Sequence, residues 1–133
     1  WEQRIDSGIS SRLPACSAGT DARQGRAAHD RAVEGANSLG VDLGRHQATP
    51  LASMTLAAGD LLVGFDCENV VLLKTRAAQT TNVQVLLLGH LDELGGTLDA
   101  EVRDPWGTSA EATQGTFQRI TRLIDRLELQ LRP

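Results

Sequence analysis

Two short runs, residues 60–65 and 83–89, are apolar at nearly every position, apart from Gln84 in the second. A strand with one face in water alternates apolar and polar residues, so runs of this kind indicate strands covered on both faces. A helical stretch from about residue 68 to residue 78 separates them. Strands that alternate with helices predict an α/β fold, a three-layer α/β/α arrangement around a central parallel sheet. Binding and catalytic sites in such sheets lie at the carboxyl ends of the strands.

The first half of the chain has weaker signals. Residues 14–17 are expected to form a short buried strand, with Cys16 as a buried structural cysteine. Residues 27–39 are expected to form a helix that ends at Gly40, because glycine commonly terminates helices. Residues 1–13 carry apolar side chains four residues apart, which is typical of the last turns of a helix: Trp1, Ile5 and Ile9.

A helix near the C-terminus has the clearest periodicity. Its apolar side chains recur at spacings of 3 and 4 and predict one stripe packed on the core: Phe117, Ile120, Ile124, Leu127 and Leu131. Thr108 followed by Glu111 fits a capping box, which predicts a helix start just after residue 108.

The bulk properties predict one domain, residues 1–133, because 133 residues with 41% apolar content suffice for one core. The net charge of −4 argues against a general binder of nucleic acid or anionic membranes. The apolar runs are too short to cross a bilayer. Two cysteines provide neither a disulfide framework nor a zinc set, which favours a reducing, cytoplasmic setting. His29 and His90 have no companions at metal spacing, so no metal site is predicted.

Residues 104–107 (Asp-Pro-Trp-Gly) place a carboxylic acid beside an aromatic ring in a chain with two Trp, two Phe and no Tyr. Two interpretations are open. Asp104 is a proton donor and Trp106 a wall for a substrate ring, or the segment is simply a turn. In the second case Asp104 bonds to its own backbone, Gly107 adopts a positive φ and Trp106 packs on the core. The acidic residues at 92, 93, 99 and 101 are expected to lie in a solvated loop.

Five segments, in chain order, together resemble the low-molecular-weight protein tyrosine phosphatases. They are residues 17–20 (Ser-Ala-Gly-Thr), 40–46 (Gly-Val-Asp-Leu-Gly-Arg-His), 60–66, 83–89 and 104–107. The resemblance implies a four-stranded parallel sheet flanked by helices. It also implies hydrolysis of phosphotyrosine through a phosphocysteine intermediate, with no cofactor.

The resemblance implies roles for three residues of this sequence. Asp104 would be the general acid and base, Trp106 would contact the substrate ring, and His46 would support the phosphate-binding loop. The implied partners are phosphotyrosine proteins. A tyrosine kinase is a candidate partner, since similar bacterial proteins often oppose such kinases.

The nucleophile loop of that family, Cys-x5-Arg-[Ser/Thr], is not found in the sequence. The nearest match, Cys16 to Arg23, has six intervening residues and is followed by Gln24. Because the chain begins with Trp1 rather than Met, we expect this loop and the first strand to precede Trp1 in a longer product.

Two alternatives stay open. The first is a loop-less, non-catalytic binding module, which would expose unpaired strand edges and favour self-association through a swapped strand. The second is a relative of the arsenate reductases that uses Cys67, although no further cysteine follows it to resolve an oxidised intermediate.

Overall fold

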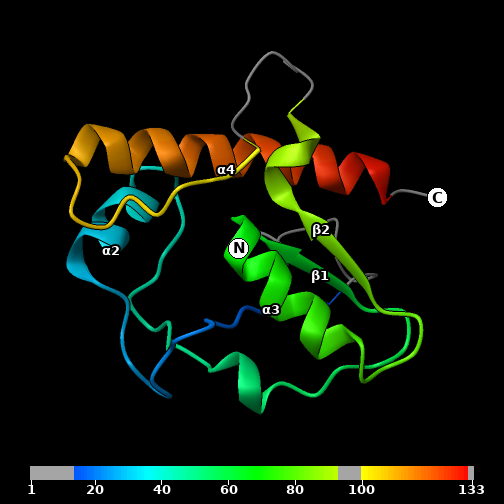
Figure 1. Ribbon diagram of the computed structural model, residues 1–133. Helices are drawn as coiled ribbons and strands as arrows, with labels where there is room; N and C mark the ends of the chain where they lie inside the picture. The colour runs from blue at the N-terminus through cyan, green and yellow to red at the C-terminus, as the bar shows by residue number, and fades with distance from the viewer. Residues whose placement is uncertain (1–13, 93–99, 132–133) are drawn as a thin grey trace. The chain divides into compact units, whose positions relative to one another are not determined.

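Strands β1 (Leu61–Gly64) and β2 (Gln84–Leu87) pair in parallel, with Leu61 opposite Gln84 and Gly64 opposite Leu87. They belong to a computed structural model that describes residues 14–92 and 100–131 (Figure 1). The α/β class and the parallel direction predicted from the sequence are confirmed. In the part of the chain that the structure describes, the sheet contains two strands rather than the four that the resemblance implies.

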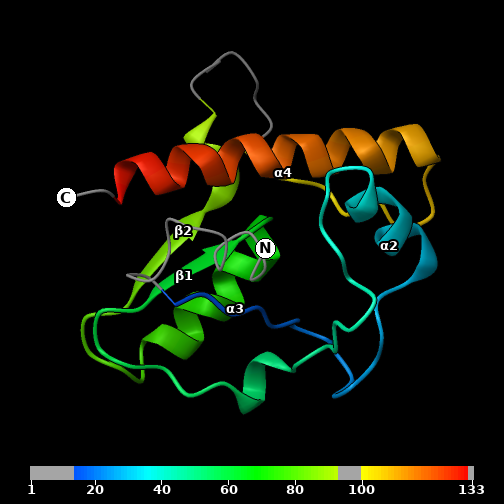
Figure 2. The same cartoon turned by 180° about the vertical axis from the view of Figure 1, so that it is seen from behind.

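The chain divides into two compact units, residues 1–54 and residues 55–133. In the second unit, helix α3 (Cys67–Ala77) connects β1 to β2 and packs on both strands, so that it covers one face of the sheet (Figures 1 and 2). The predicted helix at 68–78 is therefore confirmed to within one residue. Asp66 caps α3, and its Oδ1 accepts a hydrogen bond of 2.6 Å from the Asn69 N–H.

Gly64 allows the end of β1 to lie close to α3. A Cβ at this position would lie 3.1 Å from the Asn69 Cβ and 3.3 Å from the Leu73 Cδ1. The absence of a side chain thus sets the distance between the carboxyl end of the strand and the first turns of the helix.

The second apolar run does not continue as a strand beyond Leu87. Residues 88 and 89 begin the 3-10 helix η2 (Leu88–Leu91), whose residues Leu88, Gly89 and Leu91 are buried. The sequence prediction of a strand as far as residue 89 was therefore wrong at its carboxyl end. An apolar run reports burial, and a buried 3-10 turn produces the same pattern as a buried strand.

Helix α4 (Ala110–Gln130) packs against η2, and residues 100–109 lead to its first turn (Figure 1). Its cap is Ser109, whose Oγ accepts a hydrogen bond from the Ala112 N–H, so the predicted capping box at Thr108 was wrong by one residue. The core side of α4 is centred on Ile120 and the fully buried Leu123, whereas Leu131 of the predicted stripe is 45% exposed.

In the first unit, helix α2 (Asp30–Asn37) is shorter than the predicted 27–39, and it is followed by the 3-10 turn η1 (Leu51–Ser53). Gly40 has a φ of 75°, and the Val41 N–H donates to the Ala36 carbonyl, which confirms Gly40 as the stop signal. Residues near 19–27 and 47–51 are connected by isolated bridges, Gly19 to Pro50 and Ala27 to Gln47.

The predicted buried strand at residues 14–17 is absent, since these residues are exposed and have no strand pairing. Cys16 is an exposed free cysteine, so its assignment as a buried structural cysteine was wrong. The predicted helix tail in residues 1–13 lies outside the described residues.

Candidate active site

Residues 104–108 form a hydrogen-bonded turn. The Asp104 Oδ1 accepts a hydrogen bond of 2.9 Å from the Trp106 N–H, and the Thr108 N–H donates to the Pro105 carbonyl at 3.0 Å. Gly107 has a φ of 75°, a conformation that glycine adopts without strain. Asp104 itself is exposed. The turn interpretation is thus right about the backbone, and it leaves the carboxyl group accessible.

Trp106 is 66% exposed, so its indole ring does not pack into the core. The turn interpretation was wrong on this point. An exposed tryptophan next to an exposed carboxyl group can provide an aromatic surface for a planar substrate group. The structure therefore brings Asp104 and Trp106 together in one turn.

This turn begins beside the carboxyl end of β1. The Val102 N–H donates a hydrogen bond of 2.7 Å to the carbonyl of Phe65, the residue after β1. Val102 is 4% exposed, so the side chain next to this hydrogen bond is part of the core. Asp104 therefore lies two residues after this hydrogen bond, which tethers the segment to the carboxyl edge of the sheet. The sites of α/β proteins lie at this edge.

Glu101 connects the same segment to both neighbouring helices. Its Oε1 accepts a hydrogen bond of 3.0 Å from the N–H of Cys67, the first residue of α3. Its backbone carbonyl accepts a hydrogen bond of 2.7 Å from the Arg119 Nη1 of α4. The hydrogen bond from the Cys67 backbone lowers the pKa of Glu101.

The same contact disfavours the thiolate form of Cys67. Its hydrogen bond with the Glu101 carboxylate raises the pKa of the Cys67 thiol, and burial and the charges of Glu101 and Asp66 act in the same direction. Cysteines at helix N-termini are often activated by a lowered pKa. Here the neighbouring carboxylates oppose that effect.

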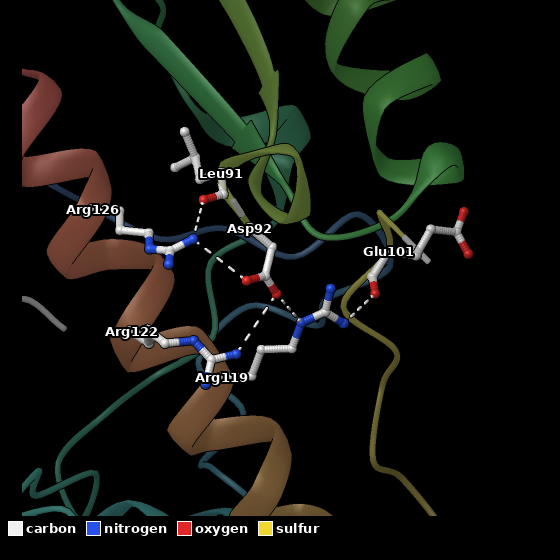
Figure 3. A network of polar contacts seen from close by, with 6 residues as sticks. All are labelled: Leu91, Asp92, Glu101, Arg119, Arg122 and Arg126. Carbon is white, nitrogen blue, oxygen red and sulfur yellow. Dashed lines mark hydrogen bonds and ion pairs between the residues drawn. The ribbon is translucent and has the colours of Figure 1, made fainter. Parts of the chain in front are cut away.

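Asp92 is the centre of an ion-pair cluster with three arginines of α4 (Figure 3). Its carboxylate lies 3.5 Å from the Arg119 Nε, 3.6 Å from the Arg122 Nη2 and 3.4 Å from the Arg126 Nη1. The Arg126 Nη1 also donates to the Leu91 carbonyl at 2.7 Å.

The Asp92 side chain is only 10% exposed, so the predicted solvated loop was wrong at this residue. Glu93 and Asp99 lie outside the described residues. The signal available in the sequence was the basic row on α4, because positions 119, 122 and 126 share one helix face and require a partner when buried.

His46 belongs to the first unit and is half-buried, and its N–H donates to the Leu43 carbonyl at 3.0 Å. Asp104 belongs to the second unit. His29 has a local role, since its Nδ1 accepts a hydrogen bond of 3.3 Å from the Arg31 N–H and caps α2.

Within residues 14–92 and 100–131, no three His, Cys, Asp or Glu side chains are grouped to hold a metal ion. Among the helices of the same residues, none is both long and apolar enough to cross a bilayer.

The profile of the low molecular weight phosphotyrosine protein phosphatase family matches residues 2–132. A comparison with curated protein sequences gives no match.

Several solved structures have a similar fold. The tyrosine phosphatase AmsI of Erwinia amylovora is 23% identical, with a TM-score of 0.75 over 99% of this chain and 83% of its own. Wzb of Vibrio vulnificus, solved with benzylphosphonate, is 22% identical, with a TM-score of 0.72 over 98% of this chain and 88% of its own. The arginine phosphatase YwlE, which Bacillus subtilis produces, is 23% identical, with a TM-score of 0.67 over 86% of this chain and 72% of its own.

Proposed function

Because the chain belongs to the low molecular weight phosphotyrosine protein phosphatase family, we propose that Asp104 is its general acid and base in the hydrolysis of phosphotyrosine. One observation carries this proposal. The turn that holds Asp104 and the 66% exposed Trp106 follows directly on the tether between Val102 and the carboxyl end of β1.

The chemistry explains why an acid is needed. A cysteine thiolate attacks phosphorus, a P–S bond forms, and the P–O bond to the tyrosine oxygen breaks. The departing phenolate has a conjugate-acid pKa of about 10, so a proton from the Asp104 carboxyl group makes it a much better leaving group. The Asp104 carboxylate then takes a proton from the water that attacks the phosphocysteine. The P–S bond breaks, which releases phosphate and restores the thiolate.

Trp106 would contact the phenyl ring and favour aryl over alkyl phosphates. His46 would support the phosphate-binding loop, as the family resemblance implies. The two compact units would act as one domain, residues 1–133, and the extent of the family match supports this. A cytoplasmic location is supported by two exposed free cysteines, Cys16 and Cys67. Phosphotyrosine proteins would be its substrates, and a tyrosine kinase its functional counterpart.

The nucleophile of this reaction has to be a thiolate, and neither Cys16 nor Cys67 fits. Six residues separate Cys16 from Arg23, one more than a phosphate-wrapping loop requires. The Cys67 thiol has a raised pKa because of its contact with Glu101. The functional test therefore uses the full-length protein.

The test compares wild-type protein and Asp104→Ala on two aryl phosphates. Phenyl phosphate has a poor leaving group, and p-nitrophenyl phosphate has a good one. Removing the general acid should lower kcat on phenyl phosphate about 10²- to 10⁴-fold and lower it much less on p-nitrophenyl phosphate. Asp60→Ala is the matched control, because the Asp60 Oδ2 accepts a hydrogen bond from the Ala57 N–H in a turn at the amino end of β1.

Wild-type rates in Asp104→Ala on both substrates would remove Asp104 from the mechanism. A full-length protein that neither turns over phosphates nor binds tungstate would instead be a non-catalytic binding module. Phosphoarginine belongs in the same assay, because YwlE is an arginine phosphatase. We expect phenyl phosphate to be preferred, since the exposed ring of Trp106 offers a surface for an aromatic group.

A further inference from the structure

Glu101 lies three residues before Asp104 and contacts elements on both sides of the segment. Figure 3 shows the contact with Arg119 of α4. Its carboxylate accepts from the first N–H of α3, and its carbonyl accepts from Arg119 of α4. The next residue, Val102, donates to the carbonyl of Phe65 at the end of β1. Residues 101 and 102 are thus connected to a strand and to two helices.

The hydrogen bonds inside the Asp104 turn have a different role. They join Asp104 to Trp106 and Pro105 to Thr108, so both partners belong to residues 104–108. Such bonds set the shape of the turn. They do not set its location relative to the sheet, because they would be unchanged if the whole turn moved.

The carboxylate of Glu101 is well suited to hold that location. It meets the N-terminus of α3, where unpaired backbone N–H groups and the helix dipole favour an anion. The hydrogen bond from Cys67 also lowers the pKa of Glu101, so the carboxylate is ionised at neutral pH.

We propose that Glu101 is a positioning residue for the proton donor, which it holds at the carboxyl end of β1 through its contact with Cys67. This inference rests on the proposed role of Asp104. Glu101 affects catalysis only by fixing the position of Asp104. The hydrogen bond from Arg119 to the Glu101 carbonyl is a second connection that holds the same backbone. A displacement of about 1 Å at a reacting group costs about 10²-fold in rate, so even a small shift of the turn should be measurable.

The test uses Glu101→Ala and Glu101→Gln in the full-length protein. Loss of the tie should lower kcat about 10-fold to 100-fold on phenyl phosphate and leave kcat on p-nitrophenyl phosphate within about twofold. Glu101→Gln keeps an oxygen that can accept from the Cys67 N–H, so it should recover part of the rate. Glu68→Ala is the matched control, because Glu68 is an exposed acidic residue in the same first turn of α3.

A double-mutant cycle gives the sharpest readout. If Glu101 acts through Asp104, Glu101→Ala should have no further effect on kcat in an Asp104→Ala background. If the two substitutions lower kcat by factors that multiply, the proposal is overturned. An equal fall of kcat on both substrates in Glu101→Ala would overturn it as well. If Asp104→Ala lowers kcat and Glu101→Ala does not, only the positioning role fails. If Asp104→Ala has no effect, the proposed function fails as well.

Alkylation of Cys67 reports on the contact without any need for turnover. Removing the Glu101 carboxylate should increase the thiolate fraction of Cys67, so iodoacetamide should modify the Cys67 peptide several-fold faster in Glu101→Gln. The Cys16 peptide of the same sample should be modified at an unchanged rate. An unchanged rate at Cys67 would mean that the Glu101 carboxylate does not lie at the N-terminus of α3 in solution, and it would overturn the proposal.

Discussion

Replacing Gly89 with alanine should destabilise the protein and displace the segment that leads to Asp104. Gly89 lies in the buried turn η2, and its Cα faces the backbone of Ala100. A Cβ at this position would overlap the carbonyl oxygen of Ala100 and lie 2.6 Å from its carbonyl carbon and 3.2 Å from its Cα. A carbon atom normally stays about 3.5–4.0 Å from such a neighbour.

The steric cost cannot be relieved by a side-chain rotation, because all three neighbouring atoms are backbone. Either η2 or the residues around Ala100 must move. Overpacking of this kind costs about 1–3 kcal/mol, which we expect as the loss in free energy of unfolding. Since Ala100 directly precedes Glu101, the movement should also weaken the contact between Glu101 and Cys67 and lower kcat on phenyl phosphate.

Gly115→Ala is the matched control. Gly115 lies within α4, and a Cβ there has nothing within 4 Å. Because glycine in a helix costs about 0.5–1 kcal/mol relative to alanine, this change should stabilise the protein by that amount. Urea unfolding of the two variants measures both effects. Wild-type stability and wild-type kcat in Gly89→Ala would refute the packing of Ala100 on η2.

Other substitutions test the ion pairs, the core and the pH response. Asp92→Asn should lower the free energy of unfolding by about 2–3 kcal/mol, because Arg119 and Arg126 would lose a partner at a site that is 10% exposed. If the cluster is buried, high salt should leave the difference in free energy of unfolding between wild type and Asp92→Asn unchanged. An unchanged urea midpoint in Asp92→Asn would contradict the prediction. Leu123→Ala should cost about 2–5 kcal/mol by leaving a cavity, and calorimetry should show the lower Tm. Since the pKa of Glu101 is lowered on folding, its contribution is present above the pKa of an unfolded Glu, about 4.3, and disappears as the pH falls through the lower folded value. The free energy of unfolding of Glu101→Gln should therefore depend less on pH below about pH 4.3 than that of the wild type. Identical acid unfolding curves for the two proteins would exclude this linkage.

The sequence predicted the strand–helix–strand centre of the second unit because adjacent residues carry the pattern that indicates burial. Leu61, Leu62 and Val63 are apolar at successive positions, which is typical of a strand covered on both faces, and Asp66 provides a cap for the helix that follows. The same reasoning failed at Leu88, because burial alone does not distinguish a strand from a 3-10 turn.

The Asp104 turn was predictable for the same local reason, since the residues that form it are adjacent in the sequence. The tie from Glu101 to Cys67 was not, because the two residues are 34 positions apart. Asp92 and its arginines are separated by up to 34 positions, and only the basic row on α4 signalled that an acid was required. Contacts of this kind depend on how the chain returns to the sheet, which periodicity does not specify.

The hydrogen bond inside the turn makes the two oxygens of the Asp104 carboxyl group unequal. Oδ1 accepts the Trp106 N–H and so keeps a lone pair directed at the backbone. If Asp104 donates a proton as proposed, Oδ2 carries that proton for as long as the turn persists. The proposed acid would then have one delivering atom with a fixed direction, so the backbone geometry of residues 104–106 would select the side from which a leaving oxygen receives its proton.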